Sequence, residues 1–139
     1  MASQTARYAI ARTVDLSFEE ADRRVREELQ KEGFGVLTEI DVAATLKQKL
    51  GVDMPRQEIL GACNPALAHQ ALQAEPDIGL LLPCNVVVRE ADTGRTVVEA
   101  LDPVVQLELA GNAALRPLAE EARARLQRVV ARVAGESVS

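Results

Sequence analysis

The stretch LLLPCNVVVREADTGRTVVEAL, residues 80–101, decides the fold of this chain. Residues 80–90 form the longest apolar segment, and the three valines at 86–88 favour a central strand that is covered on both faces. The residues Asp92-Thr93-Gly94 predict a turn, after which residues 95–101 return as a partner strand. The sequence therefore predicts an antiparallel hairpin inside a larger sheet.

The residues before this hairpin predict alternating strands and helices. Ser17 and Glu20 have the spacing of a capping box, so a helix is expected to begin there and to end near Gly33. Its apolar positions recur at helical spacing and form one buried stripe: Phe18, Ala21, Val25 and Leu29. Asp41 is expected to cap a short helix over residues 42–50. Strands are expected over residues 7–14, 34–40 and 56–62.

Two further helices are predicted from a capping residue followed by proline, in Asn64-Pro65 and Asp102-Pro103. The first is expected to run to about residue 74 and the second to about residue 110. Leucine, alanine and valine then recur at helical spacing over residues 114–133, which predicts a long last helix.

This order of elements predicts an α+β fold. We expect a single antiparallel-rich sheet packed by the long first and last helices, with short helical insertions around the third strand. The chain has 139 residues, which matches one domain with a core over about residues 7–133 and frayed tails at residues 1–6 and 134–139. The valine segment also requires a cover on the second sheet face. Dimerisation is the economical way to supply it, because an exposed apolar face aggregates.

Composition narrows the functional classes. A net charge of −5 argues against nucleic-acid binding, which normally needs a basic patch. No apolar run approaches the length of a membrane span, and the N-terminal residues lack the apolar core of a secretory signal. The two cysteines are therefore expected to be reduced thiols in a cytoplasmic protein.

The two cysteines are each followed by asparagine, as Cys63-Asn64 and Cys84-Asn85, and each adjoins a proline. Cys63 precedes a predicted helix start, where the helix dipole lowers the pKa of a thiol. Cys84 shares its strand parity with Val86. If the third and fourth strands are neighbours, the two thiols lie close together.

Three segments together resemble the domain of unknown function family 302. They are Gly61-Ala62-Cys63-Asn64-Pro65, residues 79–86 (GLLLPCNV) and Asp102-Pro103. The resemblance spans about residues 8–133. It implies a β-α-β4-α core, similar in architecture to the TATA-box-binding-protein-like folds, and a homodimer. It implies no activity, so it assigns no catalytic residue.

Four interpretations of the Cys-Asn segments stay open. The plainest is that both cysteines are small buried hydrophobes, with Asn64 as a cap and Asn85 bonded in a local turn. The others are a small-molecule pocket, a thiol redox site and a soft-metal site shared by a dimer. The single histidine, His69, excludes most histidine-dependent sites. Among the acids, Glu58 on the third strand is the one whose burial would be informative.

The leading functional hypothesis is a small-ligand-binding or accessory domain with its site at Cys63, Asn64, Cys84 and Asn85, and with no cofactor or metal. A thiol-dependent redox or detoxification enzyme is one alternative, and a homodimeric interaction module is another. Ligand binding predicts a pocket of at least about 300 Å³ at these residues. Redox chemistry predicts an exposed thiol of lowered pKa.

Overall fold

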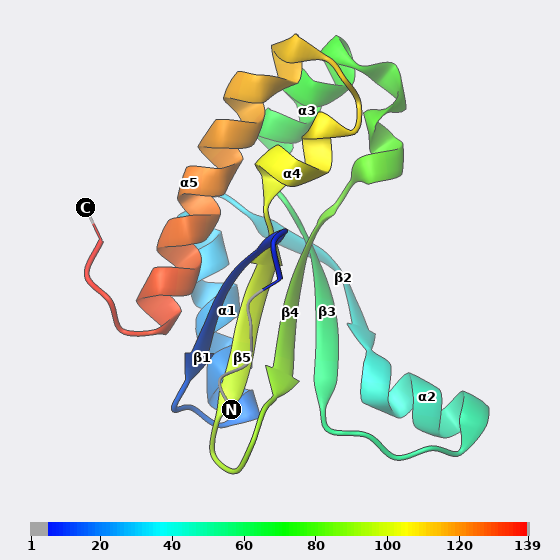
Figure 1. Ribbon diagram of the computed structural model, residues 1–139, viewed down its shortest axis with the longest axis vertical. Coiled ribbons are helices and arrows are strands. Elements are labelled where there is room, and N and C mark those ends of the chain that lie inside the picture. The colour runs from blue at the N-terminus through cyan, green and yellow to red at the C-terminus, as the bar shows by residue number, and fades with distance from the viewer. Residues whose placement is uncertain (1–5, 139) are drawn as a thin grey trace.

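Five antiparallel strands form one sheet in the order β1-β5-β4-β3-β2 (Figure 1). The structure is a computed structural model and describes residues 6–138. The strands are β1 (Ala9–Val14), β2 (Gly35–Asp41), β3 (Gln57–Cys63), β4 (Cys84–Glu90) and β5 (Thr96–Leu101). The predicted hairpin is confirmed, because β4 pairs antiparallel with β5 and Val88 lies opposite Val98. The α+β class and the antiparallel sheet are confirmed with it.

The main core lies between one face of this sheet and the helices α1 (Phe18–Lys31) and α5 (Arg116–Val133). In Figure 1, α1 lies behind the β1 and β5 side of the sheet, and the chain after it leads to β2 at the opposite edge. The predicted stripe of α1 is buried in this core: Phe18, Ala21, Val25 and Leu29. Ser17 caps the helix as expected, since its hydroxyl accepts a hydrogen bond from the Glu20 N–H at 3.2 Å.

The second face of the sheet differs from the prediction. Val86 and Val88 point into the core, whereas Val87 between them points to the other side and is only partly buried. One row of side chains on that side crosses all five strands: Ala11, Glu99, Val87, Ile59 and Ile40. We call it the open face. The expected double cover of the valine segment is therefore not supplied by α1 and α5, which both pack on the core face.

Two elements begin at other residues than predicted, and a proline explains each difference. The strand expected from residue 80 begins only at Cys84, because residues before it form the 3-10 helix η1 (Pro76–Leu81) and Pro83 has no N–H to donate to a neighbouring strand. The last helix begins at Arg116 rather than residue 114. It follows the 3-10 turn η2 (Ala113–Leu115), and its second residue is Pro117, which suits a helix start.

Two further helices lie at one end of the sheet, above β4 and β5 in Figure 1. They are α3 (Pro65–Ala74) and α4 (Pro103–Glu108), which surround a second small core with η1, η2 and the start of α5. Its members are Ala71, Ile78, Val104, Leu107, Leu115 and Ala119. Helix α2 (Val42–Leu50) stands apart beside β2 and β3 and buries none of its residues. Across residues 6–138, no helix is both long and apolar enough to span a bilayer.

The predicted frayed tails fall partly outside the described part, which omits residues 1–5 and 139. Near the C-terminal end, Glu136 is held to the first strand, since its carboxylate accepts a hydrogen bond from Arg12 Nε at 2.7 Å. This pair ties the residues after α5 to the sheet edge.

Candidate functional site

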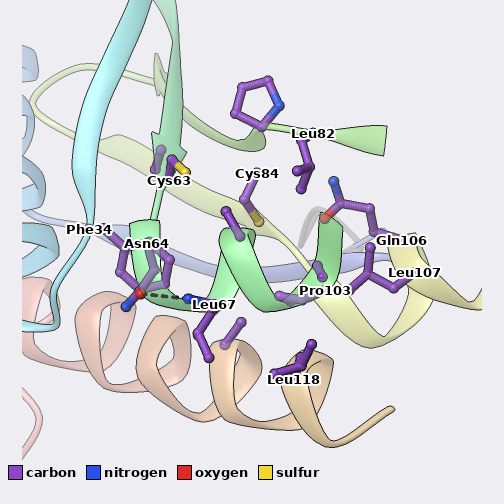
Figure 2. Close-up of a pocket in the computed structure, with 15 residues that line it drawn as sticks. Phe34, Cys63, Asn64, Leu67, Leu82, Cys84, Pro103, Gln106, Leu107 and Leu118 are labelled. Carbon is purple, nitrogen blue, oxygen red and sulfur yellow. Dashed lines mark hydrogen bonds between the residues drawn. The ribbon is translucent and has the colours of Figure 1, made fainter. Parts of the chain in front are cut away.

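A cavity of about 60 Å³ lies where the second core meets the end of the sheet (Figure 2). Strand ends β3 and β4 form one wall, α3 and α5 form the floor, and the start of α4 closes the far side. Its lining includes Phe34, Cys63, Asn64, Leu67, Cys84 and Gln106. Most of the remaining lining residues are aliphatic, so the cavity is largely apolar.

Strand pairing brings the two cysteines to this cavity. Strand β3 pairs antiparallel with β4, and Ala62 lies directly opposite Cys84. Cys63 is therefore next to the partner of Cys84, and both side chains line the cavity. The two thiols were expected to lie close together if the third and fourth strands are neighbours, and β3 and β4 are neighbours.

Asn64 closes the bottom of the cavity and begins α3. Its Oδ1 accepts a hydrogen bond from the Leu67 N–H at 3.2 Å, and Pro65 follows at the first helical position. The predicted Asn-Pro helix start is confirmed. Asn64 is 9% exposed, and its side chain contributes both the cap and part of the cavity wall.

Asn85 does not join the other three predicted residues. Successive side chains of a strand point to opposite faces, so Cys84 faces the core and Asn85 faces away. Asn85 is exposed and lines a different hollow of about 240 Å³ on the open face, together with Tyr8, Val87 and Glu99. The structure thus divides the predicted set between two sides of the sheet.

Both thiols are protonated at neutral pH. Burial raises the pKa of the Cys84 thiol to about 12, and the nearby negative charge of Asp102 adds to the shift. The Cys84 thiol donates to the carbonyl oxygen of Leu101 at 3.5 Å. Burial also raises the pKa of Cys63, although this residue precedes a helix N-terminus. These pKa shifts run opposite to those of a reactive thiolate, and both side chains line the cavity, so a lining role is favoured for both cysteines.

Gln106 is the polar lining residue that the sequence analysis missed. It lies on α4, is 8% exposed, and its amide nitrogen donates to the carbonyl oxygen of Leu81. The available signal was a single glutamine inside the apolar run PVVQLELA, residues 103–110, which places a polar side chain among buried positions.

Glu58, the acid singled out for burial, lies in a separate charged cluster between α1 and the sheet. Arg26 contacts three carboxylates there: Asp22 at 2.9 Å, Glu39 at 2.7 Å and Glu58 at 3.3 Å. Burial and the adjacent Asp22 raise the pKa of Glu58 to about 7, against the opposing effect of Arg26. Within residues 6–138, no group of three or more histidine, cysteine or acidic side chains is arranged to hold a metal ion.

The comparisons with known proteins agree with the sequence resemblance. The domain of unknown function DUF302 matches residues 10–133. This chain belongs to the DUF302 family. A similar solved structure is the crystal structure of an uncharacterized conserved DUF302 protein from Bacillus stearothermophilus. It is 30% identical, covers 92% of this chain and 99% of its own, and superposes with a TM-score of 0.84. No curated protein matches the chain.

Membership in DUF302 supports the fold and supplies no activity. The expected similarity to TATA-box-binding-protein-like folds stays a prediction.

Proposed function

We propose that this chain is a small-ligand-binding domain and that the cavity at Cys63, Asn64 and Cys84 takes a small, largely apolar group. The observation that supports the proposal is the apolar cavity itself, at the meeting point of two cores. Hydrophobic groups gain free energy when they leave water for such a space, roughly 25 cal/mol per Å² of apolar surface removed.

The size of the cavity limits what it accepts. Its volume of about 60 Å³ does not reach the roughly 300 Å³ that ligand binding was expected to require at these residues, so the cavity is too small for a drug-sized molecule. A buried water needs about 10–15 Å³ of such space, so the cavity has room for about four to six groups of the size of water. The ligand is therefore a small compound, or the apolar end of a larger one that extends into solvent.

A thiol-dependent redox enzyme is supported less well by the same site. Neither cysteine has the lowered pKa that makes a thiol nucleophilic at neutral pH. The proposed role of the cysteines is to line the cavity with weakly polar atoms.

Xenon tests the proposal, because it enters apolar protein cavities without requiring hydrogen bonds. We expect ¹⁵N amide shifts under xenon pressure to be concentrated at residues 63, 64, 66, 67, 82 and 84, since Pro65 and Pro83 have no N–H. Ala122→Leu, which adds volume from the α5 wall, should abolish these shifts. Ala124→Leu on the same helix lies outside the cavity and should leave them unchanged. Equal xenon shifts in both variants would contradict the proposal.

We further propose that the chain forms a homodimer through the open face. The row Ala11, Glu99, Val87, Ile59 and Ile40 is mostly apolar, and the charge of Glu99 is balanced by Arg89 at 3.2 Å. A neutral face of this kind can meet its own copy without repulsion between like charges. A cytoplasmic location is part of the same proposal and is supported by the two free thiols.

A further inference from the structure

The side-chain amide of Gln106 is held in one orientation beside the cavity. The residue is buried on α4, and its amide nitrogen donates to the Leu81 carbonyl oxygen at the end of η1. In Figure 2 the amide nitrogen is turned toward Leu82, and the oxygen is turned toward the side of the cavity where Cys84 lies. A flipped amide would place its oxygen against the Leu81 carbonyl oxygen, so the observed orientation is the stable one.

The Gln106 oxygen is an acceptor without a donor. Across residues 6–138, its side chain makes a single hydrogen bond, through the nitrogen. The oxygen is nevertheless not fully buried and keeps some accessible surface. A polar atom in such a position gains a hydrogen bond when a ligand donor reaches it.

Among residues 6–138, no formally charged side chain lines the cavity. Its lining residues are apolar apart from the two thiols, Asn64 and Gln106. Asp102, whose charge acts on the Cys84 thiol, is bonded elsewhere: it accepts from the Val104 N–H at 2.9 Å and pairs with Arg123 at 3.3 Å. A charged ligand would lose its hydration here without gaining a counterion, which disfavours carboxylates and ammonium groups.

We infer that the ligand of this cavity is a small neutral compound with an apolar body and one hydrogen-bond donor, such as a short-chain alcohol, and that its donor binds Gln106 Oε1. This inference rests on the proposed ligand-binding function and specifies its chemical class. The apolar body would lie against Phe34, Leu67 and Leu118, and the donor would point toward α4.

Three probes of similar size test the chemical class. 1-Butanol carries a donor, methyl propyl ether is its isomer without a donor, and butyrate is an anion. We expect ¹⁵N amide titrations of the wild-type chain to give a dissociation constant for 1-butanol about two- to twelvefold lower than for the ether, as one hydrogen bond predicts. Butyrate should bind more weakly than either.

A variant assigns the preference to Gln106. In Gln106→Met the difference between 1-butanol and the ether should disappear, whereas in Gln127→Met, on the outer surface of α5, it should persist. If Gln106→Met does not fold, the comparison in the wild-type chain still decides. Equal binding of alcohol and ether, or tighter binding of butyrate, would overturn the inference and leave the binding function intact. Absence of binding by all three probes and by xenon would overturn the binding function itself.

Discussion

Gly61 lies where β2, β3 and the residue before β4 meet, and it shows how closely one position can be constrained. A Cβ atom added there would overlap Thr38 Oγ1 and lie 2.9 Å from Pro83 Cγ. The close approach follows from the irregularity in β2 between Val36 and Thr38, which sets Thr38 opposite Gly61. Because the φ of Gly61 is not positive, backbone conformation does not require glycine here. The lack of space for a Cβ atom does.

Gly61→Ala should therefore destabilise the fold by about 1–3 kcal/mol, the usual cost of forcing extra atoms into a packed site. Urea unfolding measures the change. Gly35→Ala is the matched control, since a Cβ there meets nothing within 4 Å and Gly35 lies in the neighbouring strand. Equal losses in the two variants would show that Gly61 is not sterically confined.

Glu58 makes stability depend on pH near neutrality. Its pKa is about 7 in the folded chain against an ordinary value of 4.5, because it is buried beside Asp22. The folded state thus holds a proton that the unfolded state releases at lower pH. The stabilisation from this proton is complete below about pH 4.5 and is lost as the pH rises through 7.

Glu58→Gln should remove this component, so its free energy of unfolding should fall less than that of the wild type between pH 4.5 and 7.5. Chemical unfolding at several pH values measures the difference. Glu39→Gln removes another carboxylate from Arg26 but leaves Glu58 beside Asp22, so its pH dependence should stay close to that of the wild type. A Glu58→Gln curve parallel to the wild-type curve would rule out this role.

At the scale of elements, the helix starts with a side-chain cap were predictable, because each depends on a few adjacent residues, whereas the start of α5, which has no such cap, was misplaced. Asp41, Asn64 and Asp102 all cap where expected, with side-chain oxygens bonded to N–H groups two or three residues later.

Asn64→Ala should lower the free energy of unfolding by about 1 kcal/mol in thermal or urea unfolding, as a lost cap does. Asn64→Ser retains an acceptor and should lose less. No change in Asn64→Ala would mean that α3 is held by packing alone.

The parts that sequence reasoning did not reach depend on distant segments. The pairing of β1 with β5 joins residues about 90 positions apart, such as Ile10 and Ala100, and no local pattern encodes it. The sequence brought Cys63 and Cys84 together only on the condition that β3 and β4 are neighbours, and that pairing is seen only in the folded chain. Side chains alternate between the two faces along β4, so Asn85 points away from Cys84. The same alternation places Val86 and Val88 in the core. Gln106 entered the site through the packing of α4 against η1, which composition does not reveal.

At the scale of the whole molecule, both long helices pack on one side of the sheet, and neither covers the open face on the other side. The row across the open face contains the partly exposed Val87 and Ile59 at its centre and Ile40, 48% exposed, at the β2 edge. Helix α2, beside that edge, buries none of its residues within its own chain. A dimer that joins two open faces would remove this apolar surface from water and complete the cover that the valine segment requires.

Ile59→Arg tests this assembly, because it puts a charge at the middle of the open face, where a twofold dimer would bring two such charges together. The variant should sediment as a monomer at concentrations where the wild type sediments as a dimer, while its circular dichroism stays unchanged. Gln127→Arg adds the same charge on the exposed side of α5 and should remain dimeric. A wild-type monomer would contradict the dimer, and a dimeric Ile59→Arg would move the interface away from this face. Neither result would affect the cavity, because Cys84 and Val87 point to opposite sides of the sheet.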